Sequence, residues 1–213
     1  MKKYGEFYVT IGLEIHVALQ TKQKLFSATE NAFEVKDFSL LDIGMPGVLP
    51  VLSREPVEMA SAFALSVGAS LERYSEFERK HYFYPDLPLG YQINQQHKPI
   101  LIGGLVRIKL DGEEKLIEIE HAHLECDAAK SIHDLYHEYT AIDISRCASP
   151  LLEIVSTPCM HSPEEAKEYA KAVHSLVTFL GICDGKMEEG SFRVDASISL
   201  CKEIGKLGTR VEI

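Results

Sequence analysis

The chain has 213 residues, of which 46% are hydrophobic and 25% are charged, the composition of a globular protein with one sizeable core or two small ones. Its 22 Lys and Arg residues are outnumbered by 32 Asp and Glu residues, so the net charge is −10. Such an acidic chain is a poor general binder of nucleic acid, because affinity for the phosphate backbone depends on Lys and Arg. The acidic surplus favours bound cations instead.

The first expected element is a strand over residues 9–19. Apolar residues alternate there with a polar face that includes Glu14 and His16, a pattern typical of a half-buried strand. Gly and Pro punctuate residues 42–56, which we expect to form a loop. A helix is predicted over residues 54–71, capped by Ser53, because apolar residues recur there at helical spacing.

An aromatic segment follows, RKHYFYPDLPLGYQINQQ, residues 79–96. Pro85 and Pro88 cannot donate backbone hydrogen bonds, so we predict a loop rather than a long helix or a central strand. Its aromatic residues either seal one edge of the core or line a ligand site, and the residues alone leave both interpretations open. Lys80 leads into this segment and is suited to meet a phosphate or carboxylate as a point charge.

The second half of the chain is rich in predicted strands. Residues 100–110 and 115–127 are expected to form a hairpin, because Asp-Gly lies between them. Further strands are predicted over residues 151–156, 191–200 and 209–213. Strands outnumber helices and pair through hairpins, so the fold class is α+β with a largely antiparallel sheet.

The helix predicted over residues 161–181 has signals at both ends. These are a cap, a proline in the first turn, a capping-box acid and a terminal glycine: Ser162, Pro163, Glu165 and Gly181. We interpret this helix as scaffold.

The cysteines and the hydrophobic runs indicate a cytoplasmic protein. The five cysteines are scattered without a C-x-x-C pair, so we expect reduced thiols. Cys126 and Cys147 have no evident base beside them and are interpreted as small buried hydrophobes. We expect neither a signal peptide nor a transmembrane helix, because no long uninterrupted apolar stretch occurs.

Familiar nucleotide-binding and hydrolase motifs are missing from the sequence. There is no G-x-x-x-x-G-K-[ST], no G-x-G-x-x-G and no G-x-S-x-G. A nucleotide site in this chain would therefore be of another kind.

Acids and imidazoles, with one arginine, share the polar side of several predicted strands. They are Glu14 and His16; His121, His123, Glu125 and Asp127; Glu153; and Arg193 and Asp195. An antiparallel sheet commonly shows water such a polar face. Carboxylates with imidazoles on several strands also fit a hard-cation site, since Mg²⁺ takes one or two carboxylates and leaves room for phosphate oxygens. Spacing alone does not decide between the two.

Six motifs together resemble the B subunit of tRNA-dependent amidotransferases: IGLEIHVAL, MPGVLPVL, KHYFYPDLPLGYQI, HLECDAAKSIHD, SPLLEIV and KMEEGSFRVDASIS. The resemblance covers residues 7–213. It implies a cradle domain of α+β fold. This domain would act together with the amidase (A) and small (C) subunits of the complex and with mischarged tRNA, and it would not bind a membrane. It also implies that ATP and Mg²⁺ phosphorylate a glutamate or aspartate carried on tRNA(Gln) or tRNA(Asn), and that ammonia then displaces the phosphate.

The resemblance further implies roles for residues at the motif positions. The implied catalytic residues are Glu14, Lys80, Glu125 and Asp195. The implied nucleotide-binding residues are Lys80, Tyr82, Tyr84, Glu188, Ser191 and Arg193. The implied metal ligands are Glu14, His16, Glu125 and Glu153. The aromatic segment would then form a dry wall of this pocket.

The chain departs from the family pattern at several motif positions. These are Cys126, where a glutamate is usual, together with Ala129, Ser145, Ala148, Ser149 and Ser197. A carboxylate lost at Cys126 is expected to weaken a Mg²⁺ site. Many members carry zinc cysteines ahead of the MPGVLPVL motif, and this chain has none there, so no structural zinc is expected.

We expect residues 1–213 to be one catalytic cradle domain, truncated before the helical and tail domains of the family. The isolated chain is expected to be inactive. Two other interpretations remain: an assembly module that has lost its kinase chemistry and pairs with an amidase partner, or a different metal-dependent enzyme.

Overall fold

The computed structural model describes residues 3–32 and 37–213. Its elements, in chain order, are β1 (Lys3–Tyr4), β2 (Phe7–Ala18), α1 (Arg54–Val67), β3 (Ser70–Leu71), β4 (Glu78–His81), β5 (Tyr91–Asn94), β6 (Leu101–Ile102), β7 (Leu105–Leu110), β8 (Glu113–Cys126), β9 (Lys130–Ile132), β10 (Ala141–Asp143), β11 (Pro150–Ser156), α2 (Pro163–Phe179), β12 (Phe192–Cys201) and β13 (Arg210–Glu212).

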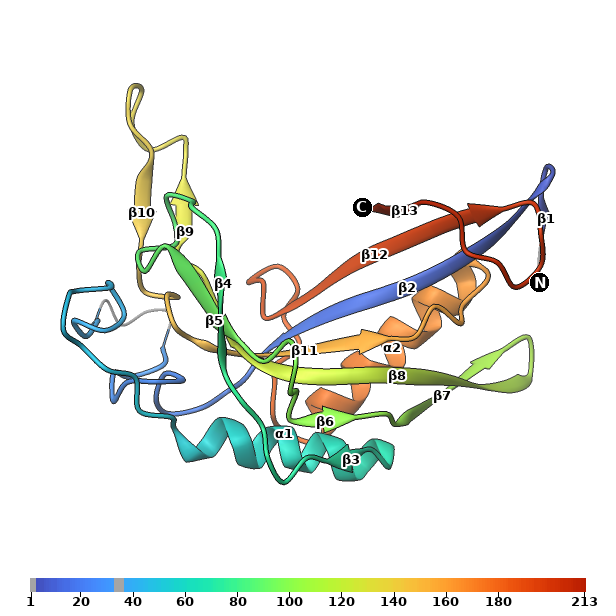
Figure 1. The fold of residues 1–213 in the computed structure, drawn as a ribbon, viewed down its shortest axis with the longest axis horizontal. Helices are drawn as coiled ribbons and strands as arrows, with labels where there is room; N and C mark the ends of the chain where they lie inside the picture. The colour runs from blue at the N-terminus through green and yellow to red at the C-terminus, as the bar shows by residue number, and fades with distance from the viewer. Residues whose placement is uncertain (1–2, 33–36) are drawn as a thin grey trace.

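A nine-stranded sheet forms the centre of the fold (Figure 1). Its strands follow the order β13-β12-β2-β11-β8-β6-β3, while β1 pairs with β2 and β7 pairs with β8. The strand pairs of this sheet in the described residues are antiparallel. The predicted α+β class with a largely antiparallel sheet is therefore confirmed.

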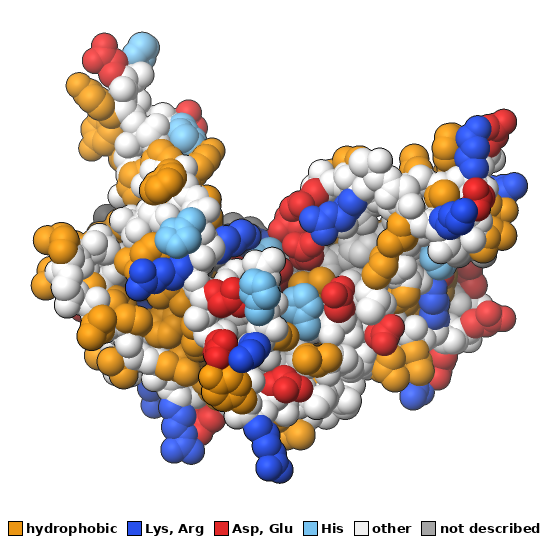
Figure 2. Space-filling model, viewed as in Figure 1, with side chains coloured by type: hydrophobic (Ala, Val, Ile, Leu, Met, Phe, Trp, Pro, Cys, Tyr) orange, Lys and Arg blue, Asp and Glu red, His pale blue; other side chains and the backbone are white. Residues whose placement is uncertain are grey.

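Both helices lie on the same side of the sheet (Figure 1). Phe63 of α1 and Tyr169 and Val173 of α2 are fully buried in one core with Ile15 of β2. In the described residues no helix covers the other face of the sheet, and the molecule is hollowed there between two projecting arms (Figure 2). A ligand would therefore reach the polar side chains of the sheet from this face.

The helix ends follow the local signals with three differences. Ser53 immediately precedes α1, as predicted, but its side chain makes no cap hydrogen bond. In α1 the chain turns at Gly68, whose φ of 67° is left-handed, so the helix ends at Val67 and not at residue 71. In α2 the Ser162 side chain accepts a hydrogen bond from the Glu165 amide at 3.1 Å, as predicted. The Glu165 carboxylate, however, accepts from the His161 amide at 2.7 Å, one residue before the cap.

A β-bulge changes which side chains of β8 face the core. The pairing register between β8 and β11 shifts between Val155 and Ser156. Ile119 before the shift and Ala122 after it are both fully buried in the helix-covered core. In a regular strand an odd-numbered and an even-numbered residue would face opposite sides of the sheet. The bulge thereby turns His121 and the odd-numbered residues after it toward the open face.

The predicted hairpin at residues 111–112 is confirmed, with Leu110 opposite Glu113 and a positive φ at both Asp111 and Gly112. The strand predicted over residues 100–110 is broken into β6 and β7. Gly104 lies between them at a φ of 114°, and a Cβ there would come within 2.8 Å of Val67 Cγ2.

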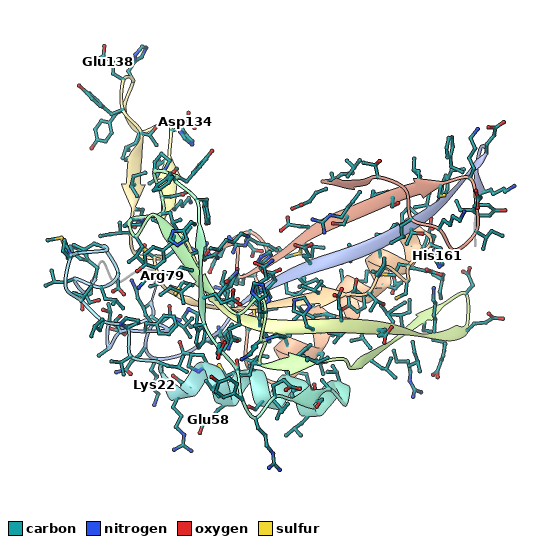
Figure 3. All side chains as sticks on the ribbon, viewed as in Figure 1. Lys22, Glu58, Arg79, Asp134, Glu138 and His161 are labelled. Atoms are coloured by element: carbon teal, nitrogen blue, oxygen red, sulfur yellow. The ribbon has the colours of Figure 1, made fainter. Side chains whose placement is uncertain are left out.

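The prediction of a loop for the whole aromatic segment is wrong at its two ends, which pair as the strands β4 and β5. A second small hairpin, β9–β10, was not predicted at all. It projects from the molecule, and Asp134 and Glu138 lie toward its tip (Figure 3).

Within residues 3–32 and 37–213, neither helix is long and apolar enough to cross a membrane.

Candidate functional site

Four adjacent strands each bring one polar residue to the same level of the sheet. Arg193 of β12 lies opposite His16 of β2, His16 lies opposite Glu153 of β11, and Glu153 lies opposite His123 of β8. Side chains of directly opposite residues share a face, with Cβ atoms about 5 Å apart. The strand register therefore builds a row of a guanidinium, an imidazole, a carboxylate and a second imidazole across the open face.

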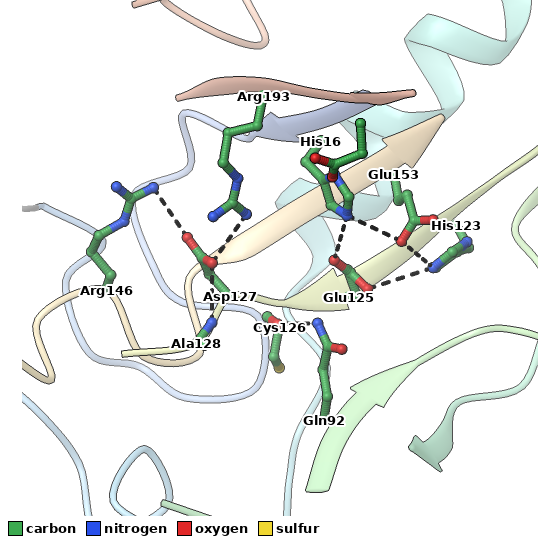
Figure 4. A network of polar contacts seen from close by, with 11 residues as sticks. His16, Gln92, His123, Glu125, Cys126, Asp127, Ala128, Arg146, Glu153 and Arg193 are labelled. Carbon is green, nitrogen blue, oxygen red and sulfur yellow. Dashed lines mark hydrogen bonds and ion pairs between the residues drawn. The ribbon is translucent and has the colours of Figure 1, made fainter. Parts of the chain in front are cut away.

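His16 is the centre of this group (Figure 4). Its Nε2 lies 3.5 Å from a Glu125 oxygen and 3.4 Å from a Glu153 oxygen, while its Nδ1 lies 3.4 Å from an Asp195 oxygen. His16, Glu125 and Glu153 each offer one ligand atom, and these atoms lie within 4.8 Å of one another. We call these three residues the ligand trio.

The acids of the trio, Glu125 and Glu153, are largely buried and lie beside two imidazoles. The side chains of Glu125 and Glu153 are 4% and 14% exposed. His123 Nε2 lies 3.2 Å from Glu153 and 3.6 Å from Glu125. Burial alone lowers the pKa of His123, but the two carboxylates outweigh it and raise that pKa to about 9. Burial likewise raises the pKa of Glu153, and the contacts with His123 and His16 overcome this and hold it below its ordinary value.

Glu14 and Asp195 lie opposite each other in the next row along β2 and β12. Asp195 contacts the trio through His16. Glu14, in contrast, is not part of the trio and pairs with Arg210 at 3.7 Å. Burial raises the pKa of Glu14, and the nearby charges of Glu153 and Glu212 raise it further. The structure thus brings together three of the four metal ligands that the resemblance implied.

Arg193 reaches from β12 to Asp127, just beyond the end of β8 (Figure 4). Its Nη2 lies 3.2 Å from Asp127 Oδ1, and the Nη2 of Arg146 lies 3.1 Å from Asp127 Oδ2. Cationic groups therefore border the trio on the side opposite His123.

Tyr82 of the aromatic segment lies close enough to this region to feel the charge of Glu125, and Lys80 is related to the region through its strand partner. Lys80 lies opposite Gln92 across the β4–β5 pair, and the Gln92 side chain donates a hydrogen bond to the Cys126 carbonyl at 2.9 Å. Burial raises the pKa of Tyr82, and the charges of Glu125 and two other acids add to this effect. Tyr84 is 65% exposed and does not pack into a dry wall.

Glu188 and Ser191 lie in and beside the turn that precedes β12. Glu188 is exposed, whereas Ser191 is 2% exposed and its carbonyl accepts a hydrogen bond from the Ala18 amide at 2.8 Å. Their implied nucleotide contacts stay predictions.

The expectation about Cys126 is corrected by the structure. Cys126 follows Glu125 on β8, so its side chain turns away from the trio and packs in an apolar cluster with Leu25, Phe26 and Ile93. Burial raises the pKa of its thiol well above the ordinary value. A carboxylate missing at this position therefore removes no ligand from the site. All five cysteines are free, as expected.

The remaining departures also lie outside the ligand trio. Ala129, Ser145, Ala148 and Ser149 belong to the connections that flank the β9–β10 hairpin, and Ser197 lies opposite Gly12 on β2. Among them Ala148, where the family usually has glycine, takes a left-handed φ of 63°.

His123 and Asp127 were grouped with Glu125 on one predicted strand face, but neither was assigned a role in the site. Arg146 was not singled out at all, although Ser145 and Ala148 on either side of it were noted as departures from the family pattern.

Comparisons with known proteins show the family to which the chain is similar. The family model described as the GatB/GatE catalytic domain matches residues 9–213. The B subunit of the aspartyl/glutamyl-tRNA(Asn/Gln) amidotransferase of Thiobacillus denitrificans is 53% identical over 208 residues, which are 95% of this chain and 44% of that protein. The B subunit of the same name from Legionella pneumophila strain Paris is 51% identical over 213 residues, 98% of this chain and 45% of that protein.

The chain thus spans less than half the length of these relatives, while the family match runs through nearly all of the chain, including every residue of the ligand trio. The chain belongs to the GatB/GatE catalytic-domain family.

Proposed function

We propose that this chain is the catalytic cradle from the B subunit of a tRNA-dependent amidotransferase. In this proposal it works in the cytoplasm as part of a ligase complex with the amidase (A) and small (C) subunits. The cradle uses ATP and Mg²⁺ to phosphorylate the side-chain carboxylate of a glutamate or aspartate mischarged on tRNA(Gln) or tRNA(Asn), and ammonia then displaces the phosphate. The names of the relatives support this proposal.

The two-sided setting of His16 is the observation that carries the proposal. Nε2 faces the carboxylates of Glu125 and Glu153, and Nδ1 faces Asp195. A metal-binding histidine commonly offers one ring nitrogen to the ion and uses the other on a carboxylate that orients the ring. Two carboxylates and one imidazole are a suitable donor set for Mg²⁺ or Mn²⁺.

In the proposed reaction the chain's own residues hold and orient the charged groups. Mg²⁺, when bound by the trio, would offset the negative charge of the phosphates. Asp195 would keep His16 in one ring orientation. Arg193 and Lys80 would meet phosphate oxygens, to which a cation binds best through charge-assisted hydrogen bonds. Tyr82, whose pKa is raised, would remain a neutral hydroxyl beside the acids.

The proposal of a cradle with intact kinase chemistry is favoured over that of an assembly module. The departures from the family pattern leave His16, Glu125 and Glu153 in place, and Cys126 faces away from them. No observation on the described residues favours the assembly module instead.

Single-turnover release of γ-phosphate from ATP tests the proposal, in the complex with the amidase and small subunits and with mischarged tRNA. Glu153→Gln should reduce release by roughly 10²-fold or more, because it removes a negative ligand oxygen from the trio. Glu168→Gln, on the surface of α2, is the matched control and should release phosphate at the parent rate. Release by Glu153→Gln at the parent rate would sink the proposal.

A further inference from the structure

Asp127 is a buried carboxylate whose position is fixed by the backbone around it. It is 6% exposed. Its amide donates to the Ser149 carbonyl at 2.8 Å, and its carbonyl accepts from the Ala148 amide at 3.0 Å. Its Oδ1 also accepts from the Ala128 amide at 3.0 Å. The carboxylate is therefore held in one place before any arginine approaches it.

Two arginines from different segments meet on this carboxylate. Arg146 from the segment before β11 lies 3.1 Å from Oδ2, and Arg193 of β12 lies 3.2 Å from Oδ1. Asp127 thus links the two arginines, and Arg193 lies in the row that continues to His16.

The two arginines are not equivalent. Arg146 also donates to the carbonyls of Glu189 and Gly190, at 2.8 and 3.2 Å, and so ties the turn before β12 to β8. The Arg193 side chain is 42% exposed, and within residues 3–32 and 37–213 its one hydrogen bond is that to Asp127. A guanidinium has five N–H donors, so most donors of Arg193 remain available to a ligand.

We propose that Asp127 is a positioning residue, which anchors Arg193 so that its remaining donors point to an anionic phosphate group bound beside His16. An unanchored arginine would lose side-chain conformational entropy on binding a ligand, and part of that cost is met in advance here. The inference rests on the proposed nucleotide-dependent function and adds a residue to which that function assigns no role.

A double-mutant cycle on the full chain tests the inference, with the dissociation constant for Mg·ADP as the measured quantity. Asp127→Asn and Arg193→Gln should each weaken binding by about tenfold or more, the range expected for a charge-assisted hydrogen bond. The double variant should bind no more weakly than the weaker single variant, because both changes remove the same contact. Arg107→Gln, in an exposed pair with Glu114, is the matched control and should bind as the parent does.

Each outcome separates this inference from the proposed function. Equal binding of Mg·ADP by Asp127→Asn and the parent, or additive losses in the double variant, overturns the inference alone. A parent chain that binds Mn²⁺ but not Mg·ADP overturns both. If Asp127→Asn does not fold in a thermal melt, Asp127→Glu keeps the charge and moves the carboxylate by one methylene. It should then bind Mg·ADP at least threefold more weakly, and parent affinity would overturn the inference.

Discussion

Lys80 is exposed on β4, and its strand partner links it to the site. Gln92, directly opposite, reaches the carbonyl of Cys126 at the end of β8. Because opposite residues share a face, the Lys80 side chain lies on the side of β4 that looks toward this strand end. Arg79, its neighbour, lies on the other side and packs over the Tyr91 ring at 4.8 Å.

We therefore expect Lys80→Ala to slow γ-phosphate release in the assembled complex by roughly 10²-fold, if the contact contributes about 3 kcal/mol in the transition state. Lys80→Arg should restore only part of the rate, since the planar guanidinium of arginine differs in shape and reach from the lysine ammonium. The melting temperature of Lys80→Ala should stay close to that of the parent, as is usual for exposed positions.

Arg79→Ala is the matched control for this change, because it removes a cation from the opposite side of the same strand. It should release phosphate at the parent rate. If Lys80→Ala also releases phosphate at the parent rate, Lys80 does not act in the site. A fall of many degrees in its melting temperature would instead assign Lys80 to the packing of the hairpin.

At the scale of elements, the irregular segment before α1 is held by a buried polar cluster. Asp42 is fully buried and accepts hydrogen bonds from Ser27 and Thr29, each at 2.9 Å, and from the Ser39 amide at 2.8 Å. Lys24, also fully buried, places its ammonium 3.6 Å from the same carboxylate. These contacts join residues 24–29 to residues 39–42.

Asp42→Asn should lower the free energy of unfolding by about 3–5 kcal/mol, because it leaves the Lys24 ammonium buried without a counter-charge. The double variant Lys24→Met with Asp42→Asn should recover part of this loss. Chemical denaturation measures both, and Arg54→Gln in an exposed helical pair serves as control, with a change below about 0.5 kcal/mol. A loss under about 1 kcal/mol for Asp42→Asn would show that the charge of Asp42 does not hold this segment.

Glu165 at the start of α2 makes stability depend on pH. Burial raises its pKa, but the Lys115 ammonium at 2.8 Å and the His161 amide outweigh burial and bring that pKa below its ordinary value. A lowered folded-state pKa stabilises the fold above the unfolded pKa, and this contribution disappears as the pH falls through the folded pKa.

Glu165→Gln should therefore reduce the free energy of unfolding by about 1 kcal/mol at pH 7, and the difference from the parent should shrink steadily below pH 4.5. Urea denaturation over a pH series measures this. A difference that stays constant down to the lowest pH would mean that the carboxylate acts by its shape and not by its charge.

Local patterns were enough to predict the elements whose signals lie within their own residues. The strand alternation of β2 and β12 and the cap of α2 at Ser162 are of this kind. The missed features depend on distant partners. β4 and β5 form because each pairs with the other across the aromatic segment, and the bulge at Val155 and Ser156 follows from the pairing of β8 with β11.

The candidate site also depends on contacts between residues that are distant in the sequence. The sequence showed that Glu14, His16, Glu125 and Glu153 face outward, but which of them meet depends on strand register, which single-strand patterns do not contain. His16 meets Glu125 and Glu153 because β11 lies between β2 and β8. Glu14 lies one row further along the sheet and pairs with Arg210 of β13 instead.

At the scale of the whole molecule, the sheet face that no helix covers in the described part of the chain carries both signs of charge. The acids and imidazoles of the ligand trio and His123 lie on one side, and the arginines around Asp127 lie on the other. A phosphate with its bound cation carries the complementary arrangement of charges. The central claim is that these strands form one site for a divalent cation, centred on His16, Glu125 and Glu153.

Anomalous diffraction from crystals soaked in Mn²⁺ shows whether a cation binds at the trio. We expect one strong peak in contact with His16 Nε2 and with carboxylate oxygens of Glu125 and Glu153. The peak should be lost in Glu153→Gln and kept in Glu168→Gln. No peak at millimolar Mn²⁺, or a strong peak only at other residues, would rule out a cation site at these three residues.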